Sequence, residues 1–155
     1  MCRKFYGQFN NIMSVLGKQS NEMSTVSLIK TYCLPTLLCG CEAWTLTDGS
    51  LYKLNTAWNN CFRRIFSCCW RESTQPLQFY CKSLPIYLLL DQRKLILWMK
   101  MYRSNNIVLK TLSGVTYYEL LATCSKYSID VTDMSENIIK QTIWKVFSHT
   151  VGADL

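Results

Sequence analysis

The residues of this chain best suited to chemistry are cations and amides that can bind the phosphates of a nucleic acid. Lysine and arginine neutralise phosphate charge, and amide side chains donate hydrogen bonds to phosphates and sugars. These residue types are concentrated in the stretch 59–64 and again between residues 93 and 103. The candidate nucleic-acid-binding residues are Lys53, Asn60, Arg63, Arg64, Arg71, Arg93, Lys94, Lys100 and Arg103.

Aromatic residues lie among these cations and have flat faces on which bases can stack. The four concerned are Trp58, Phe62, Trp70 and Trp98. Large aromatic side chains in an apolar helical pattern more often fill a protein core than contact a ligand. We therefore assign most of the four to packing.

The charge of the chain is unevenly distributed. Residues 1–110 contain 14 Lys or Arg and 5 Asp or Glu, a net charge of +9, whereas residues 111–155 contain 3 and 5, a net charge of −2. We interpret residues 1–110 as a basic helical domain and residues 111–155 as a C-terminal helical appendage. A basic surface favours a polyanionic partner, although many domains carry such charge only for solubility.

The chain is poor in the groups that catalysis or metal binding requires. Its single histidine, His149, lies close to the C-terminal end, and no two acidic residues are spaced to hold a pair of magnesium ions. The nine cysteines include no Cys-x-x-Cys pair and do not match the spacing of structural zinc sites. We expect no catalytic residue, no metal and no cofactor, and we expect reduced cysteines that pack as small hydrophobic side chains.

The location of the protein is predicted from its apolar segments, which are too short to cross a membrane. No apolar run approaches the ~20 residues that a membrane-spanning helix needs. Polar residues, including Gln8 and Asn10, occupy the place where a signal peptide would have its apolar block. We expect no membrane partner and an intracellular location, either nuclear or cytoplasmic.

Apolar periodicity predicts an all-α fold, a compact domain of about six or seven helices. The clearest period places Leu51, Leu54, Trp58, Cys61, Phe62 and Ile65 on one face of a helix that follows the turn at 47–49. A helix capped by Ser20 or Asn21 should end or kink at Pro35, because proline lacks the amide proton. The other predicted helices span 2–16, a short stretch after 73–76, 86–103, and two segments on either side of a polar loop at 125–135.

From residue 28 to residue 66, an apolar stretch broken by proline is followed by a Trp-Thr-Leu-Thr turn and by a helix with a double arginine. This order of features resembles the region just after the polymerase palm in reverse transcriptases of LINE-type (non-LTR) retrotransposons. Cys39 stands where the family usually has tyrosine, and the chain has no Tyr/Phe-x-Asp-Asp signature. The matching residues are Pro35, Gly40, Glu42, Trp44, Thr45, Leu46, Arg63, Arg64 and Ile65.

The resemblance, which extends from about residue 3 to residue 103, implies a thumb and post-thumb region. In the family this helical bundle grips the template-primer duplex, with Arg63 and Arg64 in a thumb-side motif and Arg93 and Lys94 in a later helix. The chain would then be a non-catalytic C-terminal fragment of an RNA-directed DNA polymerase from a transposable element. Its expected partner is RNA or an RNA-DNA duplex, and its palm, fingers and endonuclease domains would be missing.

Two alternatives remain open at this point. The chain could be a helical protein-interaction module that binds a partner helix through the Leu51–Ile65 face. It could also be a degenerate remnant with no function.

Overall fold

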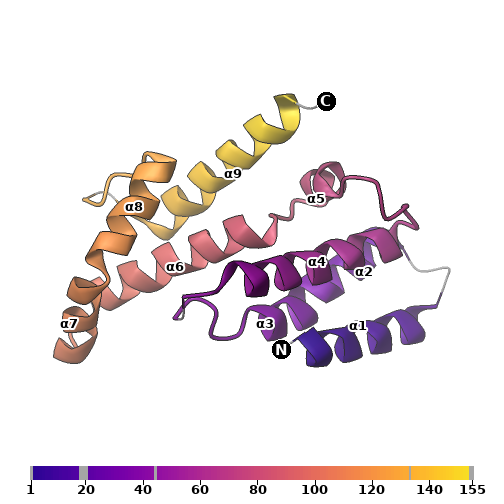
Figure 1. The fold of residues 1–155 in the computed structure, drawn as a ribbon, viewed down its shortest axis with the longest axis horizontal. Helices are drawn as coiled ribbons and strands as arrows, with labels where there is room; N and C mark the ends of the chain where they lie inside the picture. The colour runs from indigo at the N-terminus through magenta and orange to yellow at the C-terminus, as the bar shows by residue number, and fades with distance from the viewer. Residues whose placement is uncertain (1, 18–20, 44, 133, 154–155) are drawn as a thin grey trace. The chain divides into compact units, whose positions relative to one another are not determined.

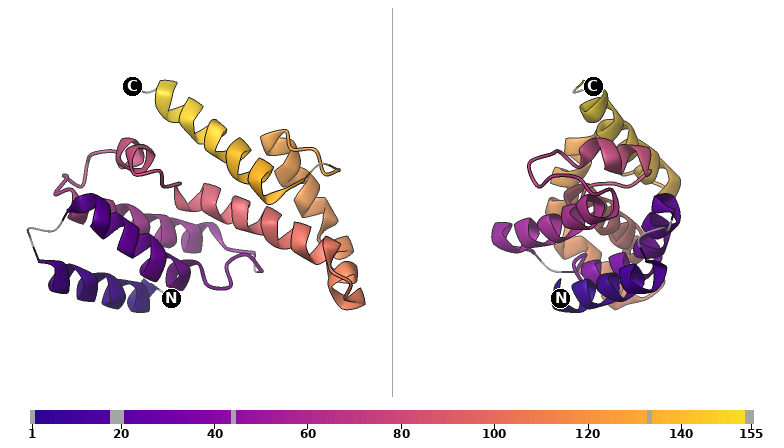
Figure 2. Two further views of the ribbon diagram at one scale, coloured as in Figure 1. Left: turned by 180° about the vertical axis from the view of Figure 1, so that it is seen from behind. Right: turned by 90° about the vertical axis from the view of Figure 1, so that its right-hand side faces the viewer.

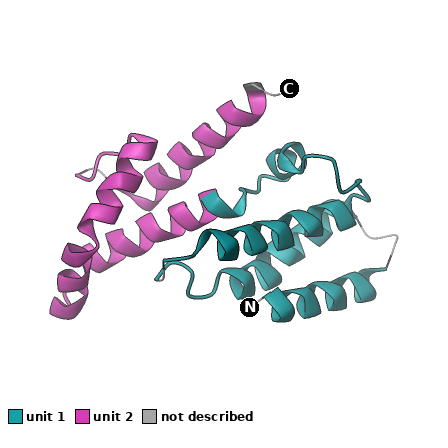
Figure 3. Cartoon of the chain, viewed as in Figure 1, with its two compact units in different colours: residues 1–87 teal, residues 88–155 magenta. Residues whose placement is uncertain are grey.

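The computed structural model describes residues 2–17, 21–43, 45–132 and 134–153, and the regular secondary structure of these residues is helical, without a strand (Figure 1). The predicted all-α class is therefore confirmed. The chain forms two compact units, residues 1–87 and 88–155 (Figure 3). The boundary between them falls near the start of a long helix and differs from the division at residue 110 that the charge distribution suggests, which stays a prediction.

Unit 1 is built on a rod of three consecutive helical segments. These are α2 (Glu22–Leu28), a π-helical turn (Ile29–Cys33) and α3 (Leu34–Leu38). The helices α1 (Cys2–Leu16) and α4 (Asp48–Ile65) both pack against the rod and against each other. Figures 1 and 2 show these helices side by side from different directions. The short helix α5 (Gln75–Tyr80) completes the unit.

The ends of these helices follow the signals in the sequence. The side chain of Asn21 accepts hydrogen bonds from the amides of Met23 and Ser24 at the start of α2, and Thr47 caps α4 through the amide of Ser50. Gly17 ends α1 with φ +68°, a conformation that glycine adopts without steric cost. The cap predicted at Asn21 is therefore confirmed, while Ser20 lies outside the described residues.

The sequence predicts that a helix ends or kinks at Pro35, but the helical rod continues past Pro35 to Leu38. The chain leaves the α-helical hydrogen-bond pattern one turn earlier, at the π-helical turn, and Pro35 then lies in the first turn of α3. A proline is tolerated there because the amides of a first helical turn have no partner within the helix. The apolar stretch after it is buried at Leu37, Leu38 and Cys41.

The core of unit 1 is made mainly of aromatic side chains from α1 and α4. Phe5 and Phe9 of α1 and Trp58 and Phe62 of α4 are at most 1% exposed. The rings of Trp58 and Phe62 meet edge to face with their centroids 5.2 Å apart. Burial of each such side chain stabilises the fold by about 1.5–3 kcal/mol.

Unit 2 contains most of α6 (Ile86–Arg103), together with α7 (Ile107–Val115), α8 (Tyr117–Tyr127) and α9 (Glu136–Ala153). The predicted limits of the 86–103 helix are confirmed. The indole of Trp98 in α6 donates a hydrogen bond to the carbonyl of Ser113 in α7 at 2.9 Å. The helix α7 was not predicted, and its side chains Ile107, Val108 and Val115 are more than 60% exposed. Among the helices of the described residues, none combines the length and the apolar character that a membrane crossing needs.

Candidate nucleic-acid interface

The outer side of α4 carries three of the predicted binding residues in one line. Lys53, Asn60 and Arg64 are seven and four residues apart, spacings that return to the same side of an α-helix. The opposite side of α4 is buried in the core of unit 1, so this line is fixed on the outside. Lys53 and Arg64 are exposed and Asn60 is half-buried.

Arg64 is held in one orientation by two residues of α1. Its Nη1 donates a hydrogen bond to Oδ1 of Asn10 at 2.7 Å, and its guanidinium carbon lies 5.0 Å from the ring centroid of Phe9. A guanidinium carries five N–H donors in a planar fork. One hydrogen bond to Asn10 therefore leaves most of these donors for a ligand.

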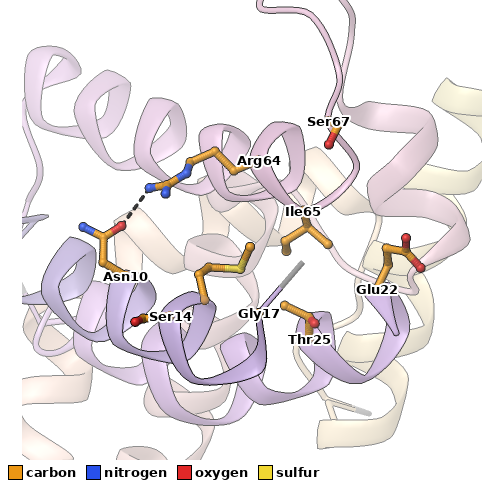
Figure 4. A pocket seen from close by; sticks show the side chains of 9 residues that line it. Asn10, Ser14, Gly17, Glu22, Thr25, Arg64, Ile65 and Ser67 are labelled. Carbon is orange, nitrogen blue, oxygen red and sulfur yellow. Dashed lines mark hydrogen bonds between the residues drawn. The ribbon is translucent and has the colours of Figure 1, made fainter. Parts of the chain in front are cut away.

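Arg64 is one of the residues that line a groove of about 900 Å³ on unit 1. Figure 4 shows Arg64 and Glu22 on opposite sides of this groove, with Ile65 and Thr25 between them. Hydroxyl and amide groups in the lining can exchange hydrogen bonds with sugars and phosphates. The lining residues are Asn10, Met13, Ser14, Gly17, Glu22, Thr25, Arg64, Ile65 and Ser67.

Arg63 lies beside this line and is used within unit 1. Its Nη1 donates to Oδ1 of Asn60 at 3.2 Å, and its Nη2 donates to the backbone carbonyl of Glu72 at 3.2 Å. The side chain is half-buried and ties the end of α4 to the loop that follows. That Arg63 contacts phosphate stays a prediction. In the structure its hydrogen bonds hold Asn60 and the loop at Glu72 in place.

The loop after α4 presents an exposed tryptophan and arginine side by side. Trp70 is 73% exposed, and the guanidinium carbon of Arg71 lies 5.0 Å from its ring centroid. The assignment to packing is confirmed for Trp58, Phe62 and Trp98, which are buried. Trp70 is the exception among the four, because it lies in a loop outside the periodic stretch of α4 and has no helical face that must turn inward.

The remaining predicted cations lie on the part of α6 that belongs to unit 2. Arg93 and Lys94 are half-buried and Lys100 is exposed. Nη2 of Arg103 donates to the carbonyl of Met134 at 2.7 Å, so this arginine joins α6 to the segment before α9. At least one of the predicted binding residues on α6 is therefore occupied by a contact within unit 2.

Acidic groups also face the cations of unit 2. The pKa of Glu136 is lowered chiefly by a hydrogen bond from Lys140 and by its charge, with a smaller contribution from the charge of Lys100. Nζ of Lys126 lies 2.7 Å from Oδ2 of Asp91. These neighbours reduce the positive potential of unit 2 and leave unit 1 as the better candidate interface.

Neither the protein-family models nor the curated proteins nor the solved structures with which the chain was compared match it. The resemblance to LINE-type reverse transcriptases therefore rests on the sequence motifs. Trp44, one of its residues, lies outside the described part of the chain. The double arginine lies at the end of α4, where the resemblance expects a helix to carry it.

Four cysteines of unit 1 are core residues, whereas Cys39 and Cys69 are exposed and Cys2 and Cys68 are half-buried. Cys33, Cys61 and Cys81 are buried free thiols, and burial raises the pKa of each, most strongly for Cys61. Among the residues that the structure describes, no three histidine, cysteine, aspartate or glutamate side chains are grouped so that they could hold a metal ion.

Proposed function

We propose that this chain is the non-catalytic thumb and post-thumb part of a LINE-type reverse transcriptase and that it binds template-primer nucleic acid through unit 1. The partner would be RNA or an RNA-DNA duplex, met in the nucleus or the cytoplasm. Polymerisation would require palm and fingers domains, and target cleavage an endonuclease domain, all supplied from elsewhere. The observation that carries the proposal is the side chain of Arg64, which Asn10 and Phe9 hold in place and which belongs to the lining of the groove.

The orientation of Arg64 supports phosphate binding for an energetic reason. A free arginine side chain loses rotamer freedom when it binds a ligand, at a cost of about 1–2 kcal/mol. Asn10 and Phe9 already hold the side chain of Arg64. A bidentate contact with a phosphate would therefore be formed with little further ordering.

The charge of unit 1 supports the same proposal. Residues 1–87 contain nine Lys or Arg and four Asp or Glu, a net charge of +5. Lys53 lies eleven residues before Arg64 on the same side of α4, which places the two cations about 16 Å apart along the helix axis. Two cations at this separation can contact phosphates at two points of a duplex.

The test is the salt dependence of binding to a labelled RNA-DNA hybrid, measured by fluorescence anisotropy. We compare the wild type with Arg64→Gln, which keeps an amide donor for Asn10 but removes the charge, and with Lys53→Ala. Each lost phosphate contact should make the slope of log K against log salt shallower by about 0.7–0.9. Lys145→Ala, an exposed cation of α9 in unit 2, is the matched control and should leave the slope unchanged.

Two results would contradict the proposal. One is a folded, monodisperse chain that does not bind the hybrid at low salt. The other is binding whose salt slope is the same in Arg64→Gln and Lys53→Ala as in the wild type. Circular dichroism of each variant establishes that a loss of binding is not a loss of fold.

The alternative of a protein-interaction module loses the face on which it relied. Leu54, Trp58, Cys61 and Phe62, the middle of that face, are at most 4% exposed because they form the core of unit 1. A partner helix could reach them only if unit 1 opened. A remnant without function would also give the first of the two contradicting results.

A further inference from the structure

Trp70 is a large aromatic side chain on the outside of unit 1. It is 73% exposed, whereas Trp58 is fully buried and Trp98 is 6% exposed. Indole rings in folded proteins usually bury most of their area or meet a partner. Trp70 lies in the loop between α4 and α5, in the run 67–74.

The backbone on both sides of this ring is fixed by hydrogen bonds. The amide of Cys68 donates to the carbonyl of Arg63 at 2.9 Å, and the amide of Glu72 donates to the carbonyl of Cys69 at 3.1 Å. The guanidinium of Arg63 also donates to the carbonyl of Glu72. The loop therefore presents Trp70 from an anchored backbone, which reduces the entropy that a ligand must remove on binding.

The neighbour of the ring is a cation. The guanidinium carbon of Arg71 lies 5.0 Å from the ring centroid of Trp70, over one face of the indole. An indole offers an aromatic surface on which any base can stack, and an arginine next to it can bind the phosphate of the same nucleotide. Ser67 of the same loop lines the Arg64 groove, so the stacking surface begins three residues beyond a residue of that groove.

We infer that Trp70 and Arg71 form a stacking site for an unpaired base of a nucleic-acid strand whose backbone contacts the Arg64 groove. This inference rests on the proposed function, because it names the part of the ligand that would lie next to the bound phosphates. A base inside a duplex is covered on both faces, so the site selects an overhang or a single strand. The basic charge of unit 1 favours this occupant over a protein partner.

The test compares three labelled probes at one salt concentration. They are a blunt RNA-DNA hybrid, the same hybrid with a single-stranded RNA overhang, and the same overhang built from abasic nucleotides. The wild type should bind the overhang probe about tenfold more tightly than the blunt one, as expected for one stacked base. The abasic overhang should bind clearly more weakly than the overhang with bases, because it keeps the added phosphates but lacks the base that would stack on the ring.

Variants then assign the effect to the ring. Trp70→Ala should bind the overhang probe no more tightly than its abasic form, and it should bind the blunt hybrid as the wild type does. Trp70→Phe should keep most of the preference for the overhang over its abasic form, because phenylalanine retains an aromatic face. Tyr118→Ala is the matched control, since Tyr118 is an aromatic residue of α8 that is 83% exposed. This variant should prefer the overhang probe over the blunt hybrid as strongly as the wild type does.

The outcomes separate this inference from the function on which it rests. If the wild type binds the blunt hybrid but Trp70→Ala keeps the preference for the overhang over its abasic form, the stacking site is refuted and the proposed function stands. If Trp70→Ala weakens the binding of all three probes equally, the ring does not stack on a base and the inference is also refuted. If the wild type binds none of the probes, both proposals are refuted and a protein partner for Trp70 becomes the better explanation.

Discussion

The indole Nε1 of Trp58 donates a hydrogen bond to the backbone carbonyl of Leu84 at 3.2 Å, across 26 positions of the chain. Both residues are buried, and the bond joins the middle of α4 to the segment between α5 and α6. Nζ of Lys30 makes similar contacts in the same segment, to the carbonyls of Cys81 and Lys82. Side-chain donors thus provide hydrogen bonds to backbone carbonyls of a connection that lies outside the regular helices.

Replacing Trp58 by phenylalanine should lower the free energy of unfolding by about 2 kcal/mol. The Leu84 carbonyl would lose this donor, and the smaller ring would leave a gap in the core. Urea denaturation followed by circular dichroism measures the change. Trp70→Phe is the matched control, since its exposed ring should change stability by less than about 0.5 kcal/mol. Equal midpoints for the two variants would contradict the role of Trp58 described here.

The two adjacent arginines of α4 should respond differently to substitution. Arg63→Ala removes the hydrogen bonds to Asn60 and Glu72 and should destabilise the chain by about 1–2 kcal/mol. Its salt slope for the RNA-DNA hybrid should stay within error of the wild type. A slope that falls as much in Arg63→Ala as in Arg64→Gln would show that Arg63 also contacts phosphate.

Alkaline pH should destabilise unit 1 through its buried thiols. Burial raises the pKa of Cys61 in the folded chain, so between the ordinary thiol pKa near 9 and the raised value the unfolded chain loses a proton that the folded chain keeps. The contribution is constant below the unfolded-state pKa and is lost as the pH rises above it. Between pH 7.5 and pH 9.5 the ionisation of Cys61 in the unfolded chain should lower the free energy of unfolding by about 1 kcal/mol.

The comparison of wild type with Cys61→Ala isolates this contribution. Both proteins are unfolded by urea in a reducing buffer at the two pH values, and the difference between the pH values is compared, since Cys61→Ala also leaves a cavity that lowers both values. The pH-dependent loss should be about 1 kcal/mol smaller in the variant. An identical pH dependence would mean that Cys61 ionises in the folded chain as it does in the unfolded one.

In unit 2, Asp91→Ala should destabilise the chain by about 1–2 kcal/mol. Oδ2 of Asp91 accepts a hydrogen bond from the hydroxyl of Tyr127 at 2.6 Å, and this tyrosine is 4% exposed, so its hydroxyl would lose an acceptor in the core. Lys126→Ala removes the other partner of the same oxygen, but this lysine is exposed and its loss should change stability by about 0.5 kcal/mol or less. Thermal unfolding of the two variants distinguishes these expectations, and a larger shift for Lys126→Ala would contradict them.

Much of the helical structure could be predicted from local signals. The caps at Asn21 and Thr47 and the limits of α6 follow from residue types that act on their immediate neighbours. The helix α7 was missed although Val108, Leu112 and Val115 recur at helical spacing. The same spacing would have placed these three residues in the core, whereas they are exposed, so a pattern that equates apolar with buried cannot identify the face that such a helix buries.

The candidate interface was predictable in its residue types but not in its geometry. The line of Lys53, Asn60 and Arg64 follows from the helical period of α4. That Arg64 reaches Asn10 while its neighbour Arg63 turns to the loop depends on tertiary contacts 54 and nine positions away. The exposure of Trp70 likewise depends on how the loop after α4 is anchored, which no local pattern contains.

The π-helical turn at Ile29–Cys33 changes the phase of the hydrophobic pattern along the α2–α3 rod. Each residue of an α-helix advances the side-chain direction by about 100°, so an uninterrupted helix would turn Leu34 and Leu38 well away from Val26. The wider turn accommodates one additional residue and rotates the following segment back by roughly that angle. Both leucines are accordingly buried, at 9% and 0% exposure. Deleting one residue from this turn would therefore shift α3 out of register with the core even though every apolar side chain were retained.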